Sequence, residues 1–126
     1  MRSGLLRGKR VLVLEDEPII AMLLGELIEA AGGEADCVTS LEAVDAVLEH
    51  RLPDLAVLDI NIHQNTSFDL ARRLTGLGVP LIFASGYGSK VVPAELAHFP
   101  AVTKPFGLDE LMQAFHSLLE PPGPAA

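Results

Sequence analysis

Short apolar runs alternate along this chain with longer amphipathic stretches. Residues 11–14, Val-Leu-Val-Leu, are continuously apolar and rich in β-branched side chains, as in a strand that is covered on both faces. After Pro18, apolar residues recur three and four positions apart, which is typical of one face of a helix. Thr39 and Glu42 have the spacing of a capping box and predict the start of a second helix. The pattern as a whole predicts strands at 11–14, 34–38, 55–58, 81–84 and 101–103, each followed by a helical stretch.

The segment between the fourth and fifth predicted strands, 86–100, is the least regular. It contains Gly86, Gly88, Pro93 and Pro100, which leave room for only a short or distorted helix. Strand–helix units joined by right-handed crossovers build a parallel sheet with helices on both faces. The sequence therefore predicts an α/β fold, a doubly wound five-stranded parallel sheet with an irregular or shortened fourth helix.

We expect one domain, residues 9–120, with an N-terminal extension at 1–8 and a disordered tail at 121–126. The chain has 126 residues, of which 49% are hydrophobic, and this is enough to bury a core without disulfides. Cys37, the only cysteine, lies in an apolar segment. It is predicted to be a small core residue rather than a reactive thiol.

Charge and hydropathy exclude several classes of function. The formal net charge is −8, and no basic surface of the kind that binds a phosphate backbone is apparent. No apolar run is long enough for a secretory signal or a membrane span. We therefore expect a cytoplasmic protein that contacts neither nucleic acid nor membrane.

Polar residues stand where four of the predicted strands end. Because the carboxyl ends of parallel strands meet at one edge of a sheet, these side chains should converge there. Clustered carboxylates repel one another and recruit a cation, and their oxygens suit Mg²⁺ or another divalent ion. With a lysine opposite, such a set suits attack of a carboxylate on phosphorus. The residues are Glu15, Asp16, Asp59, Asn61, Ser85 and Lys104.

Each of these residues has a simpler explanation when it is taken alone. The acids after the first strand could be helix N-terminal charges, Ser85 could be part of a turn, and Lys104 could be a solvated loop residue. Asp59 is harder to explain in this way, because a carboxylate that ends a buried strand needs a partner or an open edge. Their joint occurrence at four strand ends favours a site.

The motifs that carry these residues resemble those of the response-regulator receiver family, of the CheY-like type, across residues 11–119. VLVLEDEP is similar to the acid motif of the family's first strand, LAVLDIN to its phospho-acceptor motif and VTKPF to its lysine motif. The resemblance implies a flavodoxin-like (βα)5 fold and a cis peptide bond before Pro105. It also implies the roles of six residues: Asp59 as phospho-acceptor and metal ligand, Asp16 as direct metal ligand, Glu15 as a further metal-site acid, Asn61 as a backbone-carbonyl ligand, Ser85 as switch hydroxyl and Lys104 as phosphate-binding lysine.

A second resemblance is narrower, and three positions depart from the family pattern. PLIFASGYG at 80–88 is similar to a subgroup of single-domain receivers with a Phe-Ala-Thr-Gly-Tyr motif, known from alphaproteobacterial signalling and stress-response pathways. Glu15 stands where aspartate is more usual, and His63 where proline is common. Ala101 occupies the place of the usual switch aromatic, so the familiar rotation of that ring is impossible here.

Two hypotheses concern Tyr87 and the segment that contains it, one for how the signal is transmitted and one for how long the phosphate lasts. The 86–100 segment, with Tyr87 as its mobile ring, could carry the signal as an order–disorder element; alternatively, Tyr87 is a fixed ring over the pocket. Tyr87 could also shield an aspartyl phosphate from water.

The resemblance implies a stand-alone receiver in a two-component phosphorelay. A sensor histidine kinase or phosphotransfer protein would phosphorylate Asp59, and output would run through contacts with a downstream protein, or the domain would act as a phosphate sink. We expect no enzymatic activity beyond self-catalysed phosphorylation and dephosphorylation. The alternative is a Mg²⁺-dependent phosphohydrolase with an aspartyl-phosphate intermediate. Such enzymes, however, have a second aspartate two residues after the nucleophile, where this chain has Asn61. A binding module that works without phosphorylation is a third possibility, which the full set of acids, hydroxyl and lysine disfavours.

Overall fold

The central element is a five-stranded parallel sheet. The structure is a computed structural model, and it describes residues 4–86 and 90–119. The sheet has the order β2-β1-β3-β6-β7. Its strands are β1 (Arg10–Leu14), β2 (Glu34–Val38), β3 (Leu55–Asp59), β6 (Leu81–Ser85) and β7 (Ala101–Thr103).

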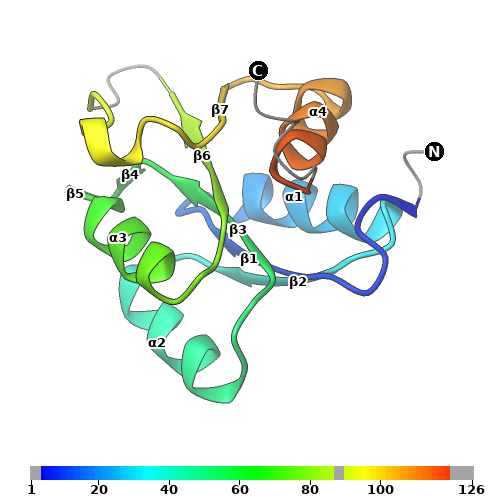
Figure 1. The fold of residues 1–126 in the computed structure, drawn as a ribbon, viewed down its shortest axis with the longest axis horizontal. Helices are drawn as coiled ribbons and strands as arrows, with labels where there is room; N and C mark the ends of the chain where they lie inside the picture. The colour runs from blue at the N-terminus through cyan, green and yellow to red at the C-terminus, as the bar shows by residue number, and fades with distance from the viewer. Residues whose placement is uncertain (1–3, 87–89, 120–126) are drawn as a thin grey trace, which may run out of the picture.

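Helices cover both faces of this sheet (Figure 1). α1 (Pro18–Ala30) and α4 (Leu108–Leu119) lie on one face, and α2 (Leu41–His50) and α3 (Phe68–Gly76) on the other. Side chains of β1 alternate between the two cores, which explains why its sequence is apolar at successive positions. The predicted doubly wound α/β fold is confirmed.

The segment between β6 and β7 holds little regular structure. Among its described residues, 86 and 90–100, the helical element is a single 3-10 turn at Ala94–Leu96. Leu96 is buried against the α3 side of the sheet, and Glu95 accepts a hydrogen bond from Arg72 of α3 at 2.9 Å. The fourth helix of the predicted pattern is thus reduced to one turn that is held against α3.

Two local predictions were wrong. The cap of α2 is Ser40, whose Oγ accepts a hydrogen bond from Ala43 N at 3.3 Å, and not the Thr39–Glu42 pair. Adjacent hydroxyl residues offer two competing starts, and the helix takes the later one. Cys37 is exposed and not in the core, because β2 is an edge strand with one open side.

The described part of the predicted N-terminal extension packs onto the domain. Leu6 is fully buried, and its backbone N–H donates to Ala31 O at 2.9 Å. A Cβ added to Gly33 would lie 3.0 Å from the Cβ of Leu6, so this glycine permits the close approach. Residues 4–8 are therefore tied to the end of α1.

A small hairpin interrupts the polar loop after β3. β4 (Asn61–Ile62) and β5 (Asn65–Thr66) pair in antiparallel fashion. Elsewhere, no helix in the described part of the chain combines the length and apolar character that a membrane span requires.

Candidate functional site

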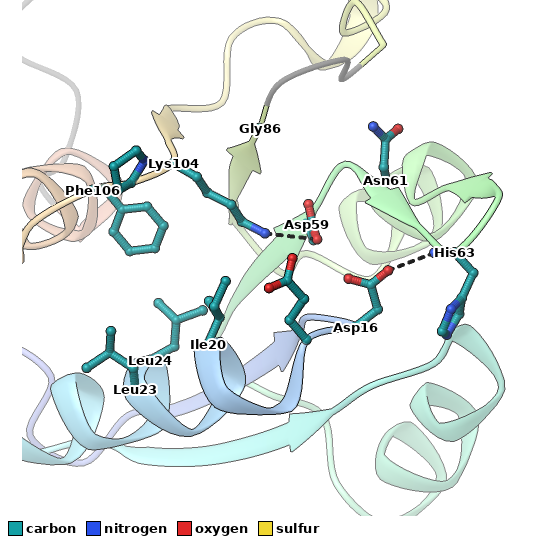
Figure 2. A pocket seen from close by; sticks show the side chains of 12 residues that line it. Asp16, Ile20, Leu23, Leu24, Asp59, Asn61, His63, Gly86, Lys104 and Phe106 are labelled. Atoms are coloured by element: carbon teal, nitrogen blue, oxygen red, sulfur yellow. Dashed lines mark hydrogen bonds and ion pairs between the residues drawn. The ribbon is translucent and has the colours of Figure 1, made fainter.

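A pocket of about 530 Å³ opens at the carboxyl edge of the sheet (Figure 2). β3 brings Asp59 to it, the segment after β1 brings Asp16, and the segment after β7 brings Lys104. The peptide bond between Lys104 and Pro105 is cis, as the resemblance implied. The predicted convergence of strand ends thus occurs around one cavity.

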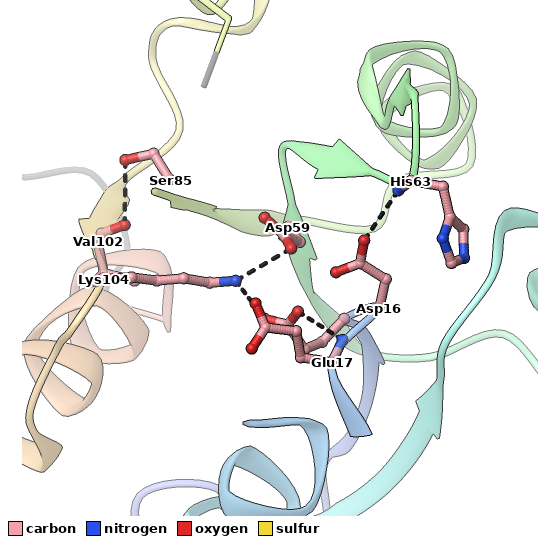
Figure 3. Close-up of polar contacts among 8 residues, drawn as sticks. Asp16, Glu17, Asp59, His63, Ser85, Val102 and Lys104 are labelled. Carbon is pink, nitrogen blue, oxygen red and sulfur yellow. Dashed lines mark hydrogen bonds and ion pairs between the residues drawn. The ribbon is translucent and has the colours of Figure 1, made fainter. Parts of the chain in front are cut away.

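Lys104 joins the two buried carboxylates of this edge. Its Nζ lies 2.5 Å from Glu15 Oε1 and 3.1 Å from Asp59 Oδ2 (Figure 3). Glu15 is 1% exposed and Asp59 6% exposed, so both contacts are shielded from water. Although burial acts to lower the pKa of Lys104, hydrogen bonds to Glu15 and Asp59 outweigh it and raise that pKa. The ammonium therefore stays charged across the physiological range.

The surroundings of Asp59 raise the pKa of its carboxyl group. Burial raises its pKa to about 6, and the charge of Glu15 acts in the same direction. The hydrogen bond and charge of Lys104 oppose this shift without cancelling it. At neutral pH Asp59 is mostly an anion that a further positive charge in the pocket would stabilise.

The neighbouring acids are held by backbone N–H groups. Glu15 Oε2 accepts from Glu17 N at 3.1 Å, and Asp16 Oδ2 accepts from His63 N at 2.9 Å. For Asp16, desolvation raises the pKa, but the hydrogen bond from His63 and further interactions outweigh it and lower that pKa. Asp16 is therefore an oriented carboxylate anion at the wall of the pocket.

The donor set suits a divalent cation. Carboxylate oxygens of Glu15, Asp16 and Glu17 can lie within 4.8 Å of one another. Asp59 and Asn61 line the same pocket, although they are not part of that cluster. Oxygen ligands of this type fit Mg²⁺. Glu17 was not among the predicted ligands, although its place in the Glu-Asp-Glu run was a visible signal.

Ser85 is placed differently from the other predicted site residues. It ends β6 at the same edge, but its Oγ is directed towards Val102 O, at 3.5 Å, and not towards Asp59 (Figure 3). It is also absent from the residues that line the pocket, where Gly86 takes its place. The structure thus brings the acids and the lysine together without the hydroxyl.

The predicted output residues are only partly described. Ala101 is exposed at the start of β7, beside Phe83 of β6. Tyr87 lies outside the described residues, so its proposed roles stay predictions.

One wall of the pocket is apolar, which the sequence did not indicate. It is formed by α1 and the segment after β7, and Figure 2 shows its side chains beside Lys104. Leu23 belongs to the apolar residues that recur at helical spacing after Pro18, and it is 51% exposed. Its neighbours Ile19 and Met22 are 77% and 60% exposed, so α1 is apolar on its outer side as well. The residues of the wall are Ile20, Leu23, Leu24, Pro105 and Phe106.

Comparison with solved structures places the chain among receiver folds. It is similar to SdrG from Sphingomonas melonis, with a TM-score of 0.78 and 29% identity over 92% of this chain and 98% of the other. A response regulator receiver protein from Burkholderia phymatum gives a TM-score of 0.77 at 24% identity, over 88% and 94% of the two chains.

Sequence relatives are longer proteins. The chain is 30% identical to the phosphate regulon transcriptional regulatory protein PhoB of Pseudomonas aeruginosa, over 93% of this chain and 54% of that one. It is 27% identical to the virulence transcriptional regulatory protein PhoP of Salmonella typhimurium, over 87% and 51%. The chain thus spans about half the length of these relatives. The sequence model of the response regulator receiver domain family matches residues 11–116 of this chain. The chain therefore belongs to that family.

Proposed function

We propose that this receiver accepts a phosphoryl group on Asp59 from a phosphohistidine, in a reaction that requires Mg²⁺. The donor is a sensor histidine kinase or a phosphotransfer protein of a two-component system. The observation that carries the proposal is the position of Asp59, a buried carboxylate 3.1 Å from an ammonium and open to a pocket lined by a second acid.

The residues support a direct displacement at phosphorus. A carboxylate oxygen of Asp59 attacks the phosphorus, and the bond between phosphorus and the donor's imidazole nitrogen breaks. The nitrogen keeps the electron pair and is protonated from solvent. The ammonium of Lys104 pairs with Asp59 before the reaction. It then contacts a phosphoryl oxygen and stabilises the negative charge of that oxygen. Glu15 keeps the ammonium at the sheet edge through its 2.5 Å contact.

The acidic pocket supports the cation requirement. Asp16 and Asp59 line it and would hold the ion, the Asn61 backbone carbonyl would be a further ligand, and Glu15 and Glu17 lie beside them. Bound Mg²⁺ supplies positive charge to the oxygens of the transferring group. Burial and Glu15 raise the pKa of Asp59, so a bound cation would also favour the ionised, nucleophilic form of this residue.

The apolar wall supports a protein donor. A donor histidine must enter the pocket to reach Asp59, and Phe106 and the exposed Leu23 line that pocket. Exposed apolar side chains that gather in one patch are typical of protein contacts. The donor is therefore expected to pack against the outer side of α1 while its imidazole enters the pocket.

For output, we propose contacts with a downstream protein through the 86–100 segment, or a role as a phosphate sink, as in the single-domain subgroup with the Phe-Ala-Thr-Gly-Tyr motif. Ala101 cannot act as a ring switch, which supports a different output element. Ser85 would serve as the switch hydroxyl by turning from Val102 O towards Asp59. The domain is a signalling phospho-acceptor and turns over no separate substrate.

The central proposal is tested by mass. Wild type and D59N are incubated with acetyl phosphate and Mg²⁺, and each intact protein is weighed. We expect one phosphate adduct on wild type and none on D59N. D45N is the control, because Asp45 is an exposed acid on α2 that pairs with Arg73 away from the pocket. An adduct missing from wild type, or equal in D59N, would refute the proposal.

A further inference from the structure

The loop of the β4–β5 hairpin brings a backbone N–H to the acidic pocket. Ile62 pairs with Asn65, so His63 and Gln64 form a two-residue loop between them. His63 N donates to Asp16 Oδ2 at 2.9 Å, and Figure 3 shows this bond at the side of the pocket away from Lys104. The donor belongs to a residue 47 positions further along the chain than its acceptor. The hairpin thus reaches the site through its main chain.

This N–H is held in place by buried neighbours. Ile60 is 2% exposed and Ile62 1% exposed, and both belong to the core on the α3 side of the sheet. Ser67 N donates to Ile60 O at 2.9 Å and closes the base of the hairpin. Because both flanks are anchored, the loop cannot move away from Asp16 without disturbing the core.

The backbone conformation at His63, the residue that makes this contact, is unusual. His63 has a φ of 58°, and among the described residues no other non-glycine residue has a positive φ. A positive φ is uncommon for a residue other than glycine, and in two-residue hairpin loops it occurs at the first position of type I′ and II′ turns. Proline, which the family commonly has at this position, could neither adopt this φ, because its own is fixed near −65°, nor donate this hydrogen bond, because it has no N–H.

We propose that His63 is a positioning residue that acts through its main chain. Its N–H holds Asp16 Oδ2 and so fixes the direction of the other oxygen, Oδ1, for a divalent cation. This inference rests on the proposed function, since it concerns the cation site next to Asp59.

The test compares two substitutions at one position. H63G keeps the N–H and accepts a positive φ, whereas H63P removes both; neither has the imidazole ring. Mg²⁺ alone is titrated into wild type, H63G and H63P, and binding is followed by NMR amide shifts. We expect H63G to bind within about threefold of wild type, and H63P to bind about tenfold more weakly or worse, as for other groups that orient a metal ligand.

The outcomes separate this inference from the proposed function. If H63P binds Mg²⁺ as tightly as H63G, the positioning role is refuted while the cation site stands. If wild type binds no Mg²⁺, the cation site fails and the positioning role fails with it.

A second measurement covers the case in which H63P does not fold. Exchange of the His63 amide proton with solvent is measured in wild type and in D16A without metal. We expect exchange to be at least about tenfold faster in D16A, because a hydrogen bond to a charged group is lost. The Gln64 amide is the internal control. Equal rates for the His63 amide in the two proteins would overturn the proposal.

Discussion

At the scale of single residues, burial determines the chemistry of Asp59. The carboxylate ends β3 inside the sheet, where desolvation raises its pKa from 3.8 to about 6 and the nearby Glu15 opposes ionisation further. At Asp59, the folded protein therefore binds more protons than the unfolded chain does between these two pH values. The contribution of Asp59 to the free energy of unfolding falls as the pH rises through this window, because ionised Asp59 is less stable in the fold than in water.

Replacing Asp59 by asparagine should remove this cost. We expect D59N to raise the free energy of unfolding at pH 7, without divalent cations, by about 1–3 kcal/mol. At pH 4 the difference should nearly vanish, because Asp59 is then largely protonated in the folded state. Urea unfolding at the two pH values measures both quantities, and excess Mg²⁺ should reduce the difference at pH 7.

E26Q is the matched control for that experiment. Glu26 is an exposed acid on α1 outside the pocket, so E26Q removes the same formal charge without changing the site. An equal gain in E26Q would mean that the effect reflects net charge alone. A lower free energy of unfolding in D59N than in wild type at pH 7 would contradict the view that ionised Asp59 destabilises the fold.

At the scale of elements, the N-terminal segment and the β4–β5 hairpin are both short pieces that are anchored by buried side chains. Leu6 is 0% exposed and packs between α1 and the sheet, where Gly33 leaves room for it. Ile62 plays the same part for the hairpin. Neither piece has a repeating pattern of its own, and each is ordered by the core that it touches.

Truncating Leu6 should therefore destabilise the whole domain. We expect L6A to lower the free energy of unfolding by about 2–4 kcal/mol, as for other fully buried leucines. L5A is the comparison, because Leu5 is only partly buried at the same core, and its effect should be clearly smaller. Urea unfolding of both variants is the measurement. Equal and small effects would show that residues 4–8 are not part of the cooperative unit.

At the scale of the whole molecule, the surface near the pocket combines an acidic centre with an apolar border. The chain has a net charge of −8, and α1 exposes Ile19, Met22 and Leu23, of which Leu23 lines the pocket that contains Asp59. A small phosphodonor needs only the pocket, whereas a protein donor must also cover this border. The two kinds of donor should thus respond differently to a charge placed on α1.

We expect L23D to slow phosphorylation by a histidine-containing donor protein at least about tenfold, since it places a desolvated charge in the contact. Phosphorylation by acetyl phosphate should change less than about threefold, because the acids and Lys104 remain in place. L52D is the control, since Leu52 is similarly exposed, at 47%, in the segment that precedes β3. The rate of phosphoryl transfer is measured as the loss of labelled phosphate from the donor. Equal slowing by both substitutions would argue against donor contact at α1.

Local pattern determined the main architecture. Side chains alternate across a strand, so a continuous apolar run such as 11–14 requires a sheet covered on both faces, and the helical periodicity supplies the cover. Parallel strands end at one edge, which is why Asp16, Asp59 and Lys104 could be assigned to one pocket from their positions after strands.

Only the tertiary structure decided how those groups are connected. The bond from His63 N to Asp16 spans elements with no shared periodicity, and it depends on a positive φ that histidine does not signal. The exposure of Leu23 and Cys37 depended on which neighbours cover α1 and β2. Ser85 ends the predicted strand, yet its hydroxyl is directed towards β7. Periodicity places a residue on an element, whereas its contacts depend on packing between distant segments, which no local pattern encodes.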